Sequence, residues 1–252
     1  MNDSSGIRRD IVVCEDKEAL SREAAHRFVF LANRKTDADG KFNVALAGGS
    51  TPELLYGLLT TSPFRDEIDW TKVHLFFGDE RAVPPDHADS NYRMANNTLF
   101  MPLALPDTHI HRMPAENYDL DAAARAYEAE MRAHFALPAV DSVPRFDLIL
   151  LGMGPDGHTA SLFPHKPALQ EKTRLVVTTE PGLKPFVPRL TLTFPVLDRA
   201  ENVLFLVAGA DKAATLQRVL NGPLDPEALP SQSVAPKEGS LVWLVDRAAM
   251  GR

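Results

Sequence analysis

The chain has 252 residues, of which 44% are hydrophobic and 24% charged, and its net charge at pH 7 is −7. This composition is typical of a globular protein with a sizeable core, and the absence of a basic stripe argues against nucleic-acid binding. A single cysteine, Cys14, excludes an intrachain disulfide framework and favours a reducing, cytoplasmic compartment, while no apolar run approaches the roughly 20 residues that a membrane-spanning helix needs.

The hydrophobic pattern predicts alternating strands and helices along the whole chain. In the first half we expect strands at 11–13, 42–46, 73–77 and 109–112, with helices at 17–34, after the N-cap Ser90, and at 120–135. In the second half we expect strands at 148–151, 175–179, 189–194, 202–207 and 241–245, a helix at 213–220, and a proline-rich loop at 221–238. The strand at 189–194 alternates polar and apolar residues, which favours a half-solvated, antiparallel strand.

This alternation predicts one α/β domain over residues 1–252, with three αβα layers around a mostly parallel, doubly wound, Rossmann-like sheet. In such sheets, ligands bind outside the carboxyl ends of the strands. The loops that follow the strands are therefore where functional side chains are expected.

The first of these loops is A-G-G-S-T-P, after the strand at 42–46. Gly48 and Gly49 permit close approach of the backbone, Ser50 or Thr51 can cap the next helix, and Pro52 suits its first turn. A capped helix start presents free N–H groups to an anion, so this loop is a candidate phosphate site. A tight strand-to-helix turn without a ligand explains the same residues.

The second loop follows the strand at 73–77 and begins G-D-E-R. Arg81 is a cation suited to clamp an oxyanion, and Asp79 lies beside it as a further substrate-binding candidate. Alternatively, Asp79 and Glu80 hold Arg81 in a structural network.

The third loop, G-M-G-P-D-G-H, follows the strand at 148–151. Its His158 has the side chain whose ordinary pKa lies nearest neutral pH, so it is a candidate general base. Asp156 can orient that imidazole, as carboxylates do in catalytic triads. The structural alternative is a turn histidine that only bonds its neighbours; among the other histidines, His87 has the most similar setting.

The same loop contains G-x-G-x-x-G at Gly152, Gly154 and Gly157, the pattern of a dinucleotide site, with Glu180 as a ribose acceptor. Asp156 argues against this interpretation because its carboxylate would lie beside the pyrophosphate charges.

Further cations and metal ligands give weaker indications. Lys212, Arg189 and Arg93 are candidate phosphate ligands, although most lysines in a first helical turn are simply solvated. No Cys, His and carboxylate cluster has zinc spacing along the sequence, so no structural metal is expected.

Taken together, the three loops resemble the signature blocks of the 6-phosphogluconolactonases. The blocks are LAGGSTPELLY, FFGDERAVPPDHADSNYRMANNTLF and FDLILLGMGPDGHTASLFP, and RLTLTFPVL, GADKA and PSQSV resemble later, weaker ones. The resemblance extends from about residue 10 to residue 247.

The resemblance implies hydrolysis of 6-phosphoglucono-δ-lactone, a small sugar-phosphate lactone, without a metal or organic cofactor. It implies that His158 activates water, that Asp156 is the carboxylate near this base, and that Arg81 contacts the substrate or stabilises charge. It also associates the turn Gly48-Gly49-Ser50-Thr51, and less directly Arg189 and Lys212, with the phosphate.

Two alternatives remain from the sequence. The related amino-sugar phosphate isomerases share the D-G-H turn but have a catalytic glutamate where this chain has Phe163, which cannot transfer protons. A non-catalytic sugar-phosphate sensor would keep the loops, but it has no need of His158. The sequence does not define an oligomer interface, and we expect a monomer.

Overall fold

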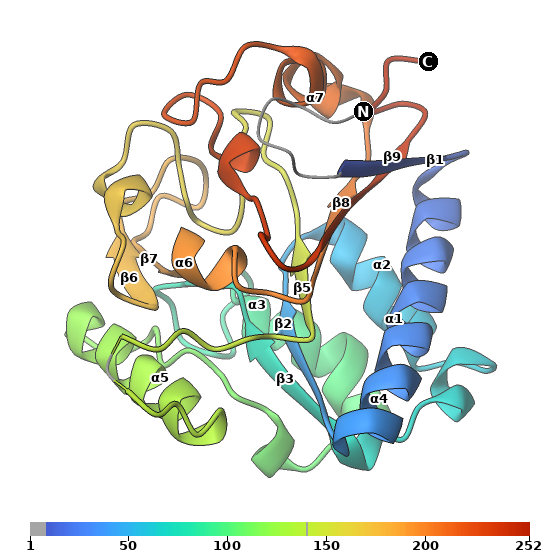
Figure 1. The fold of residues 1–252 in the computed structure, drawn as a ribbon, viewed down its shortest axis with the longest axis vertical. Coiled ribbons are helices and arrows are strands. Elements are labelled where there is room, and N and C mark those ends of the chain that lie inside the picture. The colour runs from blue at the N-terminus through green and yellow to red at the C-terminus, as the bar shows by residue number, and fades with distance from the viewer. Residues whose placement is uncertain (1–8, 140) are drawn as a thin grey trace.

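The computed structural model describes residues 9–139 and 141–252, and its centre is a six-stranded parallel sheet with helices on both faces (Figure 1). The strand order is β1-β9-β8-β5-β2-β3, and every neighbouring pair is parallel. The strands are β1 (Arg9–Cys14), β2 (Phe42–Leu46), β3 (Val73–Phe77), β5 (Leu148–Leu151), β8 (Asn202–Val207) and β9 (Ser240–Asp246). This sheet confirms the predicted α/β class.

The central strands are buried on both faces, which explains why their sequences are continuous apolar runs. Every residue of β2 and β5 is buried, and the observed bounds of β2, β3, β5 and β8 are those that the sequence predicts. The core fills the two layers between this sheet and its helices, and Phe205 stacks on Trp243 there with ring centroids 3.8 Å apart.

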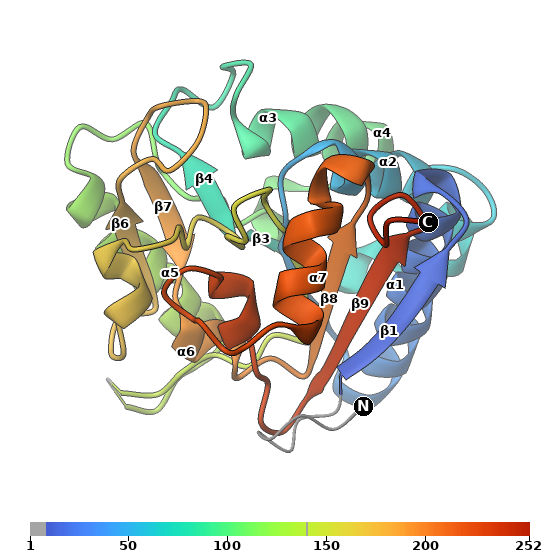
Figure 2. The ribbon, with the colours of Figure 1, turned by 90° about the horizontal axis from the view of Figure 1, so that it is seen from above.

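Seven α-helices cover the sheet or extend from its edges in the part of the chain that is described. They are α1 (Lys17–Asp39), α2 (Ser50–Leu59), α3 (Asn91–Ala95), α4 (Met101–Leu103), α5 (Leu120–His134), α6 (Phe194–Leu197) and α7 (Ala213–Asn221). Figure 2 shows α7 and α1 on opposite sides of β8 and β9. Asp16 caps α1 by accepting from the amide of Ala19. The helix was expected at 17–34 but continues to Asp39, where Gly40 ends it with φ 75°. None of the helices within the described ranges is long and apolar enough to cross a membrane.

A second, three-stranded antiparallel sheet lies beside the main one, in the order β4-β7-β6. Its strands are β4 (Asp79–Arg81), β7 (Arg189–Leu192) and β6 (Val176–Thr179). The antiparallel prediction for 189–194 is confirmed. The half-solvated prediction is wrong, because β7 is the middle strand of this sheet and all four of its residues are buried. The loop predicted at Asp79–Arg81 is β4.

The strand expected at 109–112 is also absent. The chain instead forms a 3₁₀ turn at Asp107–His109, and a single bridge pairs Ile110 with Leu75 of β3. His111 donates its amide to the Leu75 carbonyl at 2.8 Å. The next bond of a parallel ladder would run from the Phe77 amide to the His111 carbonyl. The Tyr127 hydroxyl takes its place, accepting from Phe77 at 2.9 Å and donating to His111 at 3.2 Å, so the pairing does not continue.

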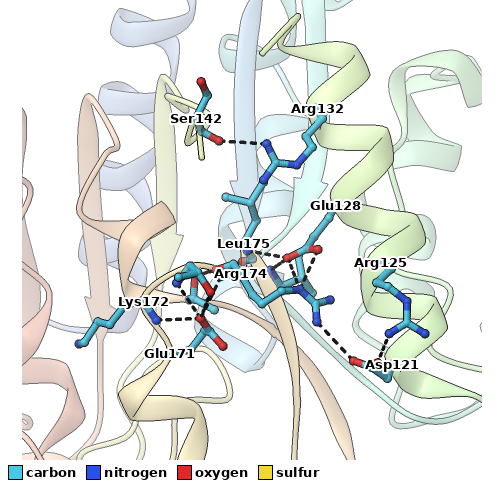
Figure 3. Close-up of polar contacts among 12 residues, drawn as sticks. Asp121, Arg125, Glu128, Arg132, Ser142, Glu171, Lys172, Arg174 and Leu175 are labelled. Carbon is cyan, nitrogen blue, oxygen red and sulfur yellow. Dashed lines mark hydrogen bonds and ion pairs between the residues drawn. The ribbon is translucent and has the colours of Figure 1, made fainter. Parts of the chain in front are cut away.

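Helix α5 is joined to the small sheet by the carboxylate of Glu128 (Figure 3). Glu128 accepts the Nε–H of Arg174 at 2.9 Å and the backbone amide of Leu175 at 2.6 Å. The amide of Val176, the first residue of β6, donates to the same oxygen at 2.9 Å. The helix therefore satisfies backbone donors where β6 begins, which fixes the small sheet beside the main one.

Candidate active site

The carboxyl ends of β2, β3 and β5 open onto a cavity of about 300 Å³. The small sheet closes one side of this cavity through Arg81 of β4 and Arg189 of β7. The sequence-predicted residues that line it are Gly48, Gly49, Asp79, Arg81, His158, Arg189 and Lys212. The three loops that the sequence singled out therefore meet at one place.

His158 stands at the end of a tight turn that only glycine permits. A Cβ at Gly154 would lie 2.0 Å from Nδ1 of His158, and Gly157 has φ +85°. The amide of Gly154 donates to the carbonyl of His158 at 2.9 Å, which closes the turn. No helix follows Gly157 directly; residues 158–166 form turns and bridges. The dinucleotide interpretation therefore lacks the helix N-terminus that it requires.

The imidazole of His158 is held by Asp156. Nδ1 of His158 lies 2.6 Å from Oδ1 of Asp156, and both side chains are partly exposed. Burial alone would raise the pKa of the Asp156 carboxyl, but hydrogen bonding and attraction to His158 outweigh it and lower that pKa below 3.8. An ionised carboxylate only accepts, so the proton of a neutral His158 lies on Nδ1 and the lone pair on Nε2.

Two hydroxyl groups from distant elements hold this turn in place. Ser231, in the 3₁₀ turn Pro230–Ser233, donates to the carbonyl of Gly157 at 2.8 Å. Thr215 of α7 donates to the carbonyl of Pro155 at 2.6 Å. Sequence reasoning missed both roles, although Ser231 lies in the P-S-Q-S-V block that the resemblance includes. The His158 turn is thus held by residues that lie much later in the sequence.

Phe163 packs against the ring of His158. It is 2% exposed, and its ring centroid lies 4.6 Å from that of His158. The guanidinium of Arg189 lies 5.9 Å from the centre of the same ring. This position therefore carries a buried apolar ring beside His158 and brings no proton-transfer group to the cavity.

Arg81 and Arg189 bring positive charge to the cavity in different ways. Arg81 donates Nη1 to the carbonyl of Asp89 at 2.6 Å, and its buried Nε has no hydrogen-bond partner among the described residues. Arg189 donates to the carbonyls of Val187 and Pro185 at 3.1 and 2.9 Å. Burial lowers the pKa of the Arg189 guanidinium, with Arg81 adding to that effect. An arginine nevertheless remains charged, so two cations face one cavity.

The acidic residues beside Arg81 are engaged elsewhere. Asp79 lines the cavity, but Oδ2 accepts from Ser161 at 2.6 Å and Oδ1 from Asn91 at 3.3 Å. Glu80 is buried, and its carboxylate accepts hydrogen bonds from the backbone amides of Arg81, Asn91 and Tyr92. The last two amides belong to the first residues of α3. Glu80 therefore binds the backbone of Arg81 and leaves its guanidinium for the cavity wall.

A second cavity of about 280 Å³ adjoins the first and shares Gly48, Gly49 and Lys212 with it. Ser50 and Thr51 line this second cavity, at the N-terminus of α2. The expected side-chain cap is absent, because Gly49 itself occupies the N-cap position at φ 101°. The first amides of a ten-residue helix are thus left for a ligand.

Lys212 supplies the cation at this end. It is the N-cap residue of α7 rather than part of its first turn. Its Nζ lies 2.9 Å from a carboxylate oxygen of Asp211, and its side chain is 21% exposed. The partial burial distinguishes Lys212 from a freely solvated lysine. Arg93, the remaining cationic candidate, lies on α3 and lines neither cavity.

Comparison with known proteins identifies the family of this arrangement. Residues 15–243 match the family model described as glucosamine-6-phosphate isomerases/6-phosphogluconolactonase. A 6-phosphogluconolactonase of Synechocystis is 44% identical over 210 residues, which cover 83% of this chain and 84% of that protein. One of Mycobacterium tuberculosis is 38% identical over 246 residues, covering 96% and 97%. The solved 6-phosphogluconolactonase of Trypanosoma cruzi superposes with a TM-score of 0.87 at 29% identity, covering 98% of this chain and 97% of that one.

Proposed function

The chain belongs to the glucosamine-6-phosphate isomerase/6-phosphogluconolactonase family, and from this premise we propose the reaction of its cavity. The protein hydrolyses 6-phosphoglucono-δ-lactone to 6-phosphogluconate, the lactone-opening step of the oxidative pentose phosphate pathway. The observation that carries this conclusion is the pair of His158 and Asp156, 2.6 Å apart, with His158 in a cavity lined by Arg81, Lys184, Arg189 and Lys212. The high identity to named lactonases supports the same reaction.

The reaction begins with His158 as general base. Nε2 takes a proton from a water molecule while the oxygen of that water attacks the lactone carbonyl carbon. The imidazolium that forms is stabilised by the carboxylate of Asp156, which also keeps the ring in the required tautomer. The ring C–O bond then breaks, and the ring oxygen takes the proton back from His158. Water is the only co-reactant, and the histidine ends the cycle neutral.

The two arginines suit the charge that develops on the carbonyl oxygen. A tetrahedral oxyanion is stabilised most by donors that are already oriented, because they need no rearrangement during the reaction. Arg81 and Arg189 are both held by backbone carbonyls, and both line the cavity. We assign the oxyanion to Arg81 first, since within residues 9–139 and 141–252 one of its guanidinium nitrogens bonds a carbonyl, whereas two of Arg189 do.

The phosphate is assigned to the second cavity. The uncapped start of α2, with Ser50 and Thr51, offers amide and hydroxyl donors there, and Lys212 adds a full positive charge. Both cavities share Gly48, Gly49 and Lys212, so one substrate spans them. Binding a phosphate away from the carbonyl orients the lactone against His158.

Phe163 favours the lactonase over the amino-sugar isomerase. Isomerisation and ring opening need a second proton-transfer group, and the buried phenyl ring at this position supplies none. A sensor without turnover is disfavoured as well, because the Asp156 hydrogen bond prepares His158 for proton transfer rather than for binding alone. We also propose a monomer in the cytoplasm, in agreement with the single, buried, free cysteine.

The test is the rate of 6-phosphoglucono-δ-lactone hydrolysis, measured by proton release after subtraction of the spontaneous rate. The wild-type protein should hydrolyse it enzymatically and should not release ammonia from glucosamine 6-phosphate. The exposed-loop variant His87→Asn is the matched control for a histidine outside the cavity. Hydrolysis at only the spontaneous rate by the folded wild-type protein would refute the proposal.

A further inference from the structure

Three imidazoles gather near the amino end of β3, opposite the end that faces the cavity. They are His74 of β3, His111 after the turn Asp107–His109, and His134 at the end of α5. One nitrogen from each ring lies within 4.8 Å of the others. His111 is buried and the other two are half-buried, so the cluster is packed yet reachable from solvent.

We propose that His74, His111 and His134 bind a divalent transition-metal ion of the zinc class. Imidazole nitrogens are ligands that suit zinc, copper and nickel, whereas calcium and magnesium prefer oxygen. The site is separate from the lactone cavity, and the inference does not rest on the proposed hydrolysis. Its elements are brought together only by the fold.

The spacing of two nitrogens already fits such an ion. Nδ1 of His74 lies 3.2 Å from Nε2 of His111. A tetrahedral zinc ion with ligand bonds of about 2.0 Å places neighbouring nitrogens about 3.3 Å apart. These two rings therefore need almost no movement to share one ion.

The other nitrogens of two rings are fixed by acceptors. Nδ1 of His111 lies 2.7 Å from a carboxylate oxygen of Glu130, on α5. Nε2 of His134 lies 2.7 Å from Oδ1 of Asn43, whose amide nitrogen donates to Asp147 at 3.2 Å. Each acceptor holds a proton on the nitrogen it faces and leaves the lone pair on the other. Metal-binding histidines characteristically have such a partner behind them.

The hydrogen bonds also fix where the protons of the cluster lie. Because Glu130 keeps the proton of His111 on Nδ1, Nε2 of His111 can only accept. Without an ion, the Nδ1–H of His74 donates to Nε2 of His111. When an ion binds to Nδ1 of His74, the proton of that ring moves to Nε2. The ring stays neutral, and no proton is released to solvent.

A fourth imidazole lies against the cluster. The ring of His109 has its centroid 4.7 Å from that of His74, and its buried Nδ1 has no hydrogen-bond partner in the described part of the chain. Three histidines fill three of the four positions around a tetrahedral ion, so water or His109 takes the last. The ion would join β3, the turn before His111 and α5, and it should raise the melting temperature.

The test uses the purified full chain after removal of metals with a chelator. Titration with Co²⁺, followed by its visible absorption, should show one tetrahedral ion per chain, and Zn²⁺ should displace it. His134→Gln should weaken binding by at least about 100-fold, and Glu130→Gln by about 10- to 100-fold. His109→Gln separates the two choices for the fourth ligand. Lactonase activity and circular dichroism report whether each variant folds.

Two control histidines locate the ion. His87→Gln, on an exposed loop, and His158→Gln, in the cavity, should bind Co²⁺ as the wild type does. Loss of binding in His158→Gln, or unchanged binding in both His134→Gln and Glu130→Gln, would place the ion elsewhere and overturn the proposal. His134 is half-buried and Glu130 is exposed, so both variants avoid the packing of His111 against Phe76.

Discussion

In the described part of the chain, two imidazole–carboxylate pairs have nearly equal geometry and different surroundings. His158 lies 2.6 Å from Asp156, and His111 lies 2.7 Å from Glu130; in each pair the bond is made by Nδ1. The ring of His158 lines a cavity that also contains two arginines and two lysines. The remaining nitrogen of His111 faces another imidazole at 3.2 Å. The pair fixes a tautomer in both places, and the neighbours of the free nitrogen decide its chemistry.

The largest expected effects come from removing one histidine of the cavity and, in a separate variant, one histidine of the cluster near the amino end of β3. His158→Gln should lower kcat for the phosphorylated lactone about 10²- to 10⁴-fold, since the general base is lost. His134→Gln, which removes a ligand of the histidine cluster and spares the packing of His111 against Phe76, should leave kcat unchanged and weaken Co²⁺ binding at least about 100-fold. Steady-state kinetics and the metal titration are run on both variants. A fall in kcat of similar size in the two would show that the cavity and the cluster are not functionally distinct.

Replacing the carboxylate of each pair should likewise lower kcat only for the pair in the cavity. Asp156→Asn should reduce kcat at least about 10-fold with little change in KM, because the amide no longer stabilises the imidazolium. Glu130→Gln is the matched change at the other pair and should leave turnover intact. If Asp156→Asn is as active as the wild type, Asp156 only shapes the turn and does not orient the base.

Removing a cation of the cavity should affect kcat/KM differently according to whether that cation contacts the phosphate or the lactone of the substrate. Lys212→Ala should lower kcat/KM for the phosphorylated lactone about 10- to 100-fold, as loss of a charged hydrogen bond does. It should not affect glucono-δ-lactone, which has no phosphate. Arg81→Ala should reduce kcat/KM for both substrates. Lys172→Ala, an exposed lysine, is the control; equal losses for Lys212→Ala on both lactones would remove the phosphate assignment.

The smallest effect concerns a half-buried carboxylate that has no imidazole partner. Asp198 accepts only the amide of Ala235 at 2.7 Å among the bonds described, and burial raises the pKa of its carboxyl to about 6. The folded state therefore holds this proton more tightly than the unfolded state, and stability falls as pH rises from 3.8 through about 6. Asp198→Asn keeps the acceptor and should gain about 1 kcal/mol at pH 7.

That gain should vanish below about pH 4, where Asp198 is protonated in both states. Urea unfolding of the two proteins at pH 4 and pH 7 provides the measurement. A gain of the same size at both pH values would mean that packing, and not charge, accounts for it. Asp156, by contrast, keeps a lowered pKa despite burial because of His158.

Local sequence was sufficient for the strands that are buried along most of their length. The strands β2, β3, β5 and β8 were predicted to the residue because a buried parallel strand is a continuous apolar run. The sequence was insufficient for the small sheet, whose β4 has three residues and two charged side chains buried by later segments. It also suggested a side-chain cap on α2, where Gly49 occupies the N-cap position.

The sequence by itself determined the α/β class, the three loops and the D-G-H turn with His158, because these depend on residue type and spacing within short stretches. Only the tertiary structure decided that Ser231 and Thr215 hold that turn, and that Arg189 comes from a second sheet to join it. It alone gathered His74, His111 and His134. These contacts join residues that are far apart in the sequence. Their distances depend on how whole helices and strands pack, and a pattern within a short stretch does not contain that information.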